Sequence, residues 1–274
     1  MTGAVRLLQH KTEAYWFYRV LSLVYDRWVN PLFWTPEMRS RALAAAALDD
    51  RTLRTLDAGA GTGFTTEGIV ERVDAERVTM LDQSPHQLAR ARAKPALDRC
   101  PKLLGDAEEL PFGADEFDRY VSAGSIEYWP DPQRAVAEAY RVLRPGGIAV
   151  VIGPVRPANA VLRRIADTWM LFPTEAEYRE LFERAGFADV ALTTLAPSWY
   201  RSTRGPYGVA VSGRKPAPGA SPLALGPPAE RARAPGGRVR SALRFAAGSL
   251  AGALFVPIAA ALALRHRLAE RRAP

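Results

Sequence analysis

The stretch that decides the fold is LDAGAGTGFTT, residues 56–66. An apolar strand is expected to end at Asp57, followed by a turn and the start of a helix. The turn holds Gly59, Gly61 and Gly63. Dinucleotide-binding enzymes space their glycines G-x-G-x-x-G, because the third glycine opens a helix whose N-terminus holds a pyrophosphate. The tighter G-x-G-x-G spacing favours close approach of the backbone to a ligand without a phosphate, although the stretch alone would also fit an ordinary glycine turn.

Seven short apolar stretches alternate with helical ones along the chain. They cover residues 54–59, 77–82, 101–106, 117–124, 147–153, 188–195 and 208–214. This alternation predicts an α/β fold, with a doubly wound, mostly parallel sheet of the Rossmann-like type. The last two stretches follow one another without an obvious helix, which favours an antiparallel strand at the edge of the sheet.

Three acidic residues stand at the ends of candidate strands. Asp57 is expected to fix the glycine turn and to receive an ammonium group of the ligand, directly or through water. Asp82 comes 23 residues after Gly59, where a carboxylate can accept two hydrogen bonds from ribose hydroxyls. Asp106 follows the third strand, where its carboxylate can accept the adenine amino group while the Ala107 amide faces a ring nitrogen.

Four signals together resemble the class I S-adenosylmethionine-dependent methyltransferases. They are the glycine turn, Asp82, GDAEELPF (105–112) and LRPGG (143–147), which is expected to form a turn before the fifth strand. The resemblance implies that S-adenosylmethionine is the cofactor, with its amino acid end on the glycine turn. Gln83 and Ser122 are predicted to complete the cofactor site.

An uncharged stretch, FAAGSLAGALFVPIAAALAL, lies near the end of the chain at residues 245–264. A helix of this length covers about 30 Å, roughly the hydrocarbon core of a bilayer. Two geometries stay open: a spanning helix, and a re-entrant segment that turns near Pro257 and keeps both arginine-rich flanks on the cytoplasmic side. A buried helix of a soluble domain is a third interpretation, although such a helix usually has a polar face and this stretch has none.

The net charge of +8 also comes from the end of the chain. Residues 201–274 hold thirteen Lys and Arg and two acids, a balance of +11, whereas residues 1–200 hold 24 and 27, a balance of −3. A basic segment beside an apolar run fits anionic lipid headgroups better than nucleic acid, so no nucleic-acid partner is expected. With one cysteine and three scattered histidines, no metal site is expected either.

The sequence divides into four parts. Residues 1–48 predict a helical lid, 49–213 the methyltransferase domain, 214–243 a linker rich in Pro, Gly and Arg, and 244–274 a membrane segment with a basic tail. The aromatic residues of the lid either only pack against the domain or cover a hydrophobic substrate. The N-terminus lacks the apolar region of a signal peptide, so the catalytic domain is expected on the cytoplasmic side of a bacterial membrane.

Longer stretches resemble one family more closely. They are AYWFYRVLSLVYDRWVNPLFWTPEMR (14–39), LDQSPHQLARA (81–91), GDAEELPF (105–112), YVSAGSIEYWPDPQRAVAEAYRVL (120–143), ADTWMLFPTEAEY (166–178), GFADV (186–190), PSWYRSTR (197–204) and SPLALGP (221–227). All are similar to the 2-methyl-6-phytyl-1,4-hydroquinone / 2-methyl-6-solanesyl-1,4-hydroquinone methyltransferases of plastids and their prokaryotic relatives. The resemblance implies an enzyme of quinone- or tocopherol-type biosynthesis that is bound to the membrane by its C-terminal segment and methylates a prenylated quinol on a ring carbon. The chain shows no plastid transit segment, so a prokaryotic member is expected.

The catalytic residues are predicted on the loop after the fourth strand. Glu127 is the candidate base for the quinol hydroxyl, although it would also fit a loop carboxylate with a structural partner, and Tyr128 is expected to orient the ring. Tyr25 and Asp26 in the lid are the alternatives to Glu127. Asp131 is expected to cap the helix that follows. The predicted substrate contacts are Tyr15, Tyr18, Tyr25, Trp28 and Trp129.

Three other functions stay open at this point. A methyltransferase of this type could act on another lipid or phenolic acceptor, such as a sterol, a polyketide phenol or a phospholipid. The chain could instead be a non-catalytic, membrane-tethered cofactor-binding protein, although all three turn glycines are intact. An NAD-dependent oxidoreductase is disfavoured by the glycine spacing.

Overall fold

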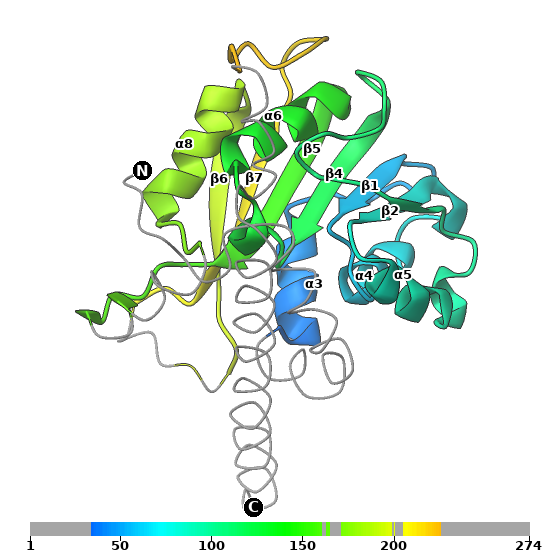
Figure 1. Ribbon diagram of the computed structural model, residues 1–274, viewed down its shortest axis with the longest axis horizontal. Coiled ribbons are helices and arrows are strands. Elements are labelled where there is room, and N and C mark those ends of the chain that lie inside the picture. Colours follow the sequence, from blue (N-terminus) through cyan, green and yellow to red (C-terminus); the bar gives the residue numbers. More distant parts are fainter. Residues whose placement is uncertain (1–33, 161–162, 165–170, 199, 201–204, 226–274) are drawn as a thin grey trace, which may run out of the picture.

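A computed structural model describes residues 34–160, 163–164, 171–198, 200 and 205–225. Seven strands form one sheet in the order β3-β2-β1-β4-β5-β7-β6 (Figure 1). The strands are β1 (Thr55–Ala58), β2 (Val78–Asp82), β3 (Lys102–Leu104), β4 (Phe117–Ala123), β5 (Leu143–Pro154), β6 (Ala188–Leu195) and β7 (Gly208–Arg214). The strands β1 to β5 are parallel, and β7 runs antiparallel to both of its neighbours, β5 and β6.

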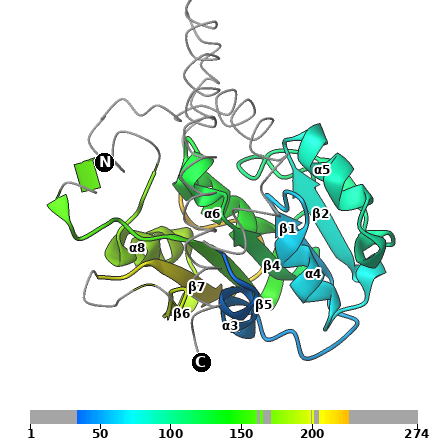
Figure 2. The ribbon, with the colours of Figure 1, turned by 90° about the horizontal axis from the view of Figure 1, so that it is seen from below.

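Helices cover both faces of the sheet. The α-helices of the described residues are α3 (Pro36–Ala44), α4 (Phe64–Val70), α5 (Pro85–Arg92), α6 (Pro132–Val142) and α8 (Glu175–Ala185). In Figure 2, α6 and α8 lie on one face of the sheet and α3 on the opposite face. Two apolar clusters fill the layers between sheet and helices, one built with α6 and α8 and the other with α3, α4 and α5. The central strands are therefore buried on both faces, as expected of a doubly wound sheet.

The helix starts follow from local sequence. Thr35 accepts a hydrogen bond from the Met38 amide at 3.3 Å, and Pro36 occupies the first turn, where its missing N–H costs nothing. Asp131 caps α6 in the same way by accepting from the Arg134 amide at 3.1 Å, which confirms the predicted cap. At the start of α8, Thr174 and Glu177 form a reciprocal capping box.

Most of the strand predictions are confirmed, with two corrections. The stretch 143–147, predicted as a turn, belongs to β5: Leu143 pairs with Phe117, and the register shifts before Arg119 pairs with Ile148. An antiparallel strand is present, but β7 lies between β5 and β6 and does not form the edge. Gly208 of β7 pairs with Pro154 of β5, 54 residues earlier, and alternation alone could not predict this contact.

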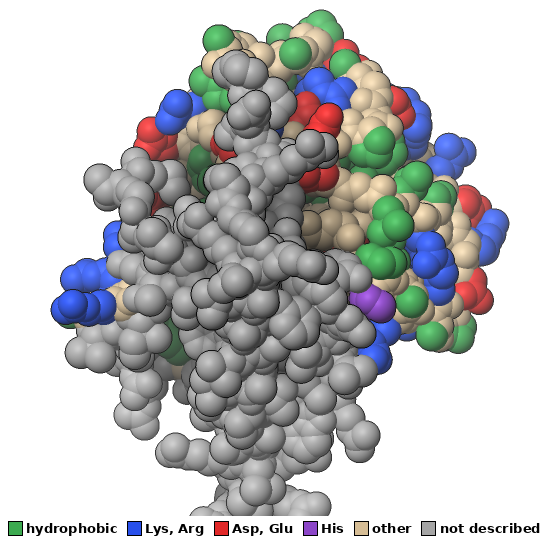
Figure 3. Space-filling model, viewed as in Figure 1, with side chains coloured by type: hydrophobic (Ala, Val, Ile, Leu, Met, Phe, Trp, Pro, Cys, Tyr) green, Lys and Arg blue, Asp and Glu red, His purple; other side chains and the backbone are tan. Residues whose placement is uncertain are grey.

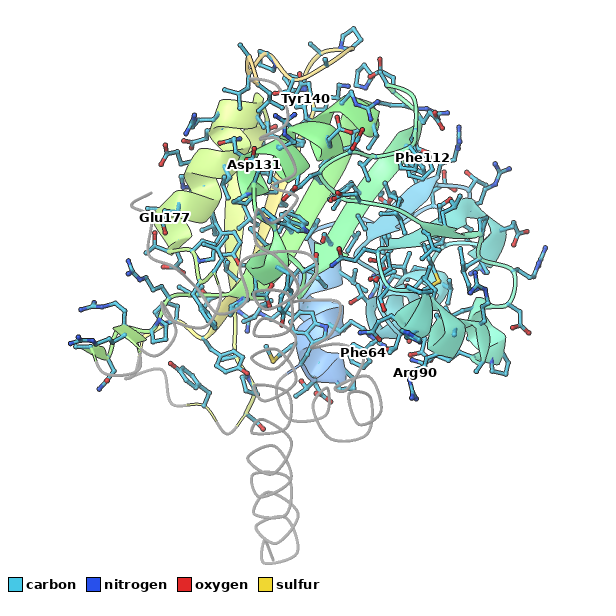
Figure 4. The ribbon with its side chains drawn as sticks, viewed as in Figure 1. Phe64, Arg90, Phe112, Asp131, Tyr140 and Glu177 are labelled. Carbon is cyan, nitrogen blue, oxygen red and sulfur yellow. The ribbon has the colours of Figure 1, made fainter. Side chains whose placement is uncertain are left out.

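The predicted linker begins with a segment that is fixed to the domain. The side chain of Lys215 is fully buried, and its Nζ donates to Asp115 Oδ1 at 2.6 Å and to the Gly219 carbonyl at 2.7 Å. The ammonium also lies 4.8 Å from the centre of the Tyr140 ring, which Figure 4 places beside this segment. Residues 215–219 are therefore held against the domain, whereas an unpacked linker was predicted from 214 onwards.

The N-terminal part that is described packs on the catalytic domain. The Arg39 guanidinium of α3 lies 4.7 Å from the centre of the Phe64 ring, and its Nη1 donates to the Phe64 carbonyl at 2.9 Å. Figure 4 shows Phe64 near α3. The end of the predicted lid thus contacts the helix that follows the glycine turn.

Several predictions lie outside the described residues. These are the lid residues Tyr15, Tyr18, Tyr25, Asp26 and Trp28, and the apolar stretch 245–264. Among the residues that the structure describes, no helix has the length and apolarity needed to cross a bilayer. On the face shown in Figure 3, basic and acidic side chains of the described residues are interspersed.

Candidate active site

The candidate site lies where the parallel strands end. The ends of β1, β2, β3 and β4 are Ala58, Asp82, Leu104 and Ala123. Because these strands are parallel and paired in register, the loops that follow them meet at one edge of the sheet. The predicted cofactor and catalytic residues therefore come together from loops separated by up to about 70 residues of sequence.

The glycine turn is tied to the neighbouring strand. The amides of Gly59 and Ala60 both donate to the Leu81 carbonyl, at 2.7 and 3.0 Å. Gly61 and Gly63 have φ angles of 57° and 86°, in the left-handed region. A Cβ on Gly63 would overlap the Leu97 side chain, whereas a Cβ on Gly61 would meet no atom within 4 Å. Gly63 is thus required for packing, and Gly61 leaves open space above the turn for a ligand.

Asp57 acts beneath this turn and not on its surface. Its side chain is fully buried, and Oδ2 accepts a hydrogen bond from Thr66 Oγ1 of α4 at 2.6 Å. Burial raises the pKa of Asp57 to about 7, and Oδ1 is buried with no hydrogen-bond partner among the described residues. The predicted role in fixing the turn agrees with this contact. Because the carboxyl group has no exposed surface, a direct contact with a ligand's ammonium group does not fit this structure. The water-mediated contact, the other predicted geometry, stays a prediction.

Asp82 is held rigidly beside the turn. Its Oδ2 accepts from the Gly61 amide at 2.9 Å and its Oδ1 from the Ser84 amide at 2.8 Å. Burial raises the pKa of this carboxyl group to about 6. Each carboxylate oxygen can accept a second hydrogen bond, so both oxygens remain able to receive a hydroxyl. The neighbouring Gln83 is exposed.

The loop after β3 places the third acid next to Asp82. The Gly105 amide donates to the Asp82 carbonyl at 3.1 Å, and Asp106 Oδ1 accepts from the Glu108 amide at 2.9 Å. Asp106 is partly exposed, whereas Ala107 is buried. The two acids predicted to bind the ribose and the adenine are therefore neighbours at one edge of the sheet.

Glu127 lies in a short 3-10 helix, η4 (Ile126–Tyr128), directly after β4. Its carbonyl accepts from the Leu171 amide at 3.2 Å, which ties the loop to the chain before α8. The side-chain Oε2 is buried with no hydrogen-bond partner among the described residues, and burial raises the pKa of Glu127 to about 7. Tyr178, whose hydroxyl donates to the Pro154 carbonyl at 3.1 Å, has a pKa raised by burial and by the nearby Glu127. Such an unpartnered carboxyl group is suited to accept a proton near neutral pH.

Two other predicted site residues are buried. Ser122 has no exposed surface, and its hydroxyl donates to the Ala58 carbonyl at 2.7 Å. Trp129 is 8% exposed and belongs to the apolar cluster with α6. The bond to Ala58 occupies the hydroxyl proton of Ser122, so a direct contact of this side chain with the cofactor does not fit the structure. The predicted substrate contact of Trp129 stays a prediction. Tyr128 is partly exposed.

The residues at this edge fit S-adenosylmethionine. The space above Gly61 is open, and Asp82 and Asp106 supply acceptors for hydroxyl and amino groups. These acceptors match the hydroxyl and amino groups of a nucleoside.

Comparisons with known proteins point to the same class of enzyme. A family model described as a methyltransferase domain matches residues 56–151, from β1 into β5. The 2-methyl-6-phytyl-1,4-hydroquinone methyltransferase 2 of Oryza sativa subsp. japonica is 52% identical over 272 residues, 98% of this chain and 78% of the relative. The corresponding enzyme of Arabidopsis thaliana is 53% identical over 273 residues, 98% of this chain and 81% of the relative. Both relatives are described as chloroplastic.

A solved structure shares the fold at much lower identity. The S-adenosylmethionine-dependent methyltransferase from Mesorhizobium loti is 24% identical, with a TM-score of 0.51 over 63% of this chain and 97% of that one. At this identity the likeness concerns the fold alone.

Proposed function

The chain belongs to the family of 2-methyl-6-phytyl-1,4-hydroquinone methyltransferases, and from that membership we propose that it methylates a ring carbon of a prenylated hydroquinone at a membrane surface. It is an S-adenosylmethionine-dependent methyltransferase. The observation that carries the substrate is the identity of about one half over 98% of the chain, which includes the loop with Glu127. A product of this kind belongs to quinone or tocopherol biosynthesis.

The cofactor supplies an electrophilic methyl group bound to a sulfonium sulfur. The ring carbon ortho to a phenolic hydroxyl is the nucleophile, and it is most reactive when the hydroxyl has lost its proton. After methylation this ring carbon loses its own hydrogen as a proton, which restores the aromatic ring. An unperturbed phenol has a pKa of about 10, so a base is needed at neutral pH. We propose that Glu127 takes this proton on Oε2, and the proposal is supported by the lack of a hydrogen-bond partner for that oxygen among the described residues. Tyr128, on the same short helix, is proposed to orient the ring.

The membrane attachment is the second part of the proposal. Burying one CH₂ group is worth roughly 0.8 kcal/mol, so extracting a C20 prenyl chain would cost on the order of 15 kcal/mol. An enzyme attached to the bilayer needs to bind only the head group. The apolar stretch 245–264 and its basic flanks support such an attachment, with the catalytic domain on the cytoplasmic side of a bacterial membrane.

A direct assay tests the substrate. Purified full-length protein is incubated with S-adenosylmethionine carrying an isotopically labelled methyl group and with 2-methyl-6-phytyl-1,4-hydroquinone in detergent micelles. We expect labelled product with one more ring methyl group, detected by mass spectrometry, and none from a quinol whose acceptor carbon is already methylated. Binding of the cofactor without methylation of any prenylated quinol would contradict the proposed substrate.

Vesicle sedimentation tests the attachment. The full chain should sediment with vesicles that contain anionic lipid, and a variant without residues 245–274 should stay in the supernatant. The truncated variant should still bind the cofactor, because all the predicted cofactor residues lie well before residue 245 in the sequence. Equal sedimentation of both proteins would contradict the attachment by this segment.

A further inference from the structure

Two serines link the end of β1 to the loop after β4. Ser122 lies in β4 with no exposed surface, and its hydroxyl donates to the Ala58 carbonyl at 2.7 Å. The Oγ atoms of Ser122 and Ser125 are 2.5 Å apart, which is hydrogen-bond distance. The end of β1, where the glycine turn begins, and the loop after β4 are therefore joined through this pair of hydroxyl groups.

The direction of these hydrogen bonds follows from the number of protons. A carbonyl oxygen can only accept, so the proton of Ser122 must lie in its bond to Ala58. The bond between the two serines must then use the proton of Ser125. With that proton engaged, the Ser125 oxygen presents only lone pairs to any further partner. Ser122 thus fixes Ser125 as an acceptor.

The position of Ser125 is next to the glycine turn. A Cβ built on Gly59 would lie 2.7 Å from Ser125 Cβ and 2.8 Å from Ser125 Oγ. The serine therefore sits directly over the α-carbon of Gly59 and occupies the place that any other side chain would need. Ser125 is partly exposed, unlike Ser122 and Asp57, so a ligand on the turn can reach it.

The amino acid end of the cofactor needs an acceptor at this place. It carries an ammonium group, and the acid predicted to receive it, Asp57, is fully buried. We propose that Ser125 binds the cofactor directly, with its hydroxyl oxygen, oriented by Ser122, accepting a hydrogen bond from the ammonium group of S-adenosylmethionine. This assignment depends on the cofactor and is independent of which quinol is methylated.

Calorimetry with two ligands tests the assignment. The first ligand is S-adenosylhomocysteine, and the second is its deamino analogue, in which hydrogen replaces the amino group. Ser125→Ala should weaken binding of S-adenosylhomocysteine about 10- to 100-fold, as expected for a hydrogen bond to a charged group. The same substitution should leave the affinity for the deamino analogue unchanged. Ser122→Ala should cause a smaller loss, again for S-adenosylhomocysteine alone, because Ser125 keeps its oxygen and loses its orientation.

Two further variants separate binding from folding. Ser212→Ala removes a hydroxyl from the middle of β7, away from the turn, and should bind both ligands like the wild type. Ser125→Cys keeps the side-chain volume with a weaker acceptor and should reproduce the selective loss if the alanine variant folds poorly. Equal losses for both ligands would mean that Ser125 only supports the loop, and an unchanged affinity for S-adenosylhomocysteine would also overturn the assignment. A wild type that binds neither ligand would instead contradict the cofactor.

Discussion

Three buried carboxyl groups differ in what surrounds them. Asp57 accepts a hydrogen bond from the Thr66 hydroxyl of α4, and Asp82 accepts hydrogen bonds from two backbone amides. Glu127 has a carboxyl oxygen with no hydrogen-bond partner among the described residues. Burial raises the pKa values of all three, to about 7, 6 and 7. Because these values lie above those of an unfolded chain, the folded state binds more protons than the unfolded one between about pH 4 and pH 7. Ionisation of these groups therefore lowers the free energy of unfolding as the pH rises through this range.

Replacement of Glu127 tests the proposed base. Glu127→Gln should lower kcat by about 10²- to 10⁴-fold, the range typical of a general base, and leave the affinity for S-adenosylhomocysteine unchanged. The wild-type rate should rise with pH through an apparent pKa of about 7, because only the ionised carboxylate accepts a proton, and this step should be absent from the variant. Steady-state kinetics on micellar quinol between pH 5.5 and about 9 would measure both effects.

Glu180→Gln is the matched control, since Glu180 is an exposed carboxylate on α8. It should keep the wild-type rate and pH profile. Full turnover by Glu127→Gln would exclude Glu127 as the base and would favour the alternatives in the lid, Tyr25 and Asp26.

Cofactor affinity should depend on pH through Asp82. A ribose hydroxyl donates best to an ionised carboxylate, so wild-type affinity for S-adenosylhomocysteine should fall as the pH drops through about 6. Asp82→Asn should bind about 10- to 100-fold more weakly at pH 8 and show a flatter pH dependence. Titration calorimetry at several pH values gives both curves. Parallel curves for the two proteins would contradict the ribose assignment.

At the residue scale, the sequence predicts acids better than serines. Asp82 and Asp106 were predicted because acids at strand ends often contact a ligand, and the structure joins their loops through the bond from the Gly105 amide to the Asp82 carbonyl. Their contacts with the cofactor stay a prediction. Ser125 was missed because its partner Ser122 bonds to Ala58, 64 residues earlier, and only the pairing of β1 with β4 brings them together. The S-A-G-S spacing at 122–125 was the only available signal.

At the scale of the turn, two glycines should fail in opposite ways. Gly61→Ala puts a methyl group into open space, so it should weaken cofactor binding strongly while costing only about 1–2 kcal/mol of stability for the left-handed φ. Gly63→Ala adds an overlap with Leu97 to the same backbone strain, and should lower the free energy of unfolding considerably more. Urea denaturation and calorimetry on both variants make the comparison. The reverse order of stabilities would contradict the described turn.

At the scale of elements, local alternation predicted all seven strands but not their partners. Apolar runs bounded by turn residues mark β6 and β7 at the residues that the structure gives, Ala188–Leu195 and Gly208–Arg214. The position of β7 inside the sheet depends on pairing with β5, which local sequence does not encode. Residues 143–147 contain Pro and two Gly and therefore suggest a turn, yet they pair irregularly with β4.

At the scale of the whole molecule, an ion pair between Lys215 and Asp115 joins the end of the domain to its middle. Lys215 is fully buried, whereas the side chain of Asp115 is 31% exposed. Replacement of Asp115 would leave the Lys215 ammonium buried without its partner. Replacement of Lys215 would leave the Asp115 carboxylate, which water can still reach. We therefore expect Asp115→Asn to lower the free energy of unfolding by about 3 kcal/mol, and Lys215→Met by clearly less.

Denaturation of both variants at pH 7 would test this order. Asn is chosen because position 115 has a φ of 61°, which Asn tolerates well. Arg51→Met, which removes an exposed partner of Asp74, is the control and should change stability by less than about 1 kcal/mol.

The place of β7 has a consequence for synthesis of the chain. β5 ends at Pro154 and its outer neighbour ends at Arg214, so about 60 residues must be added before that edge is paired. At roughly 5–20 residues per second, a nascent chain on the ribosome would expose the open side of β5 for about 3–12 s. During that interval the growing polypeptide carries an unpaired strand edge, and we expect this edge to be prone to pairing with other chains.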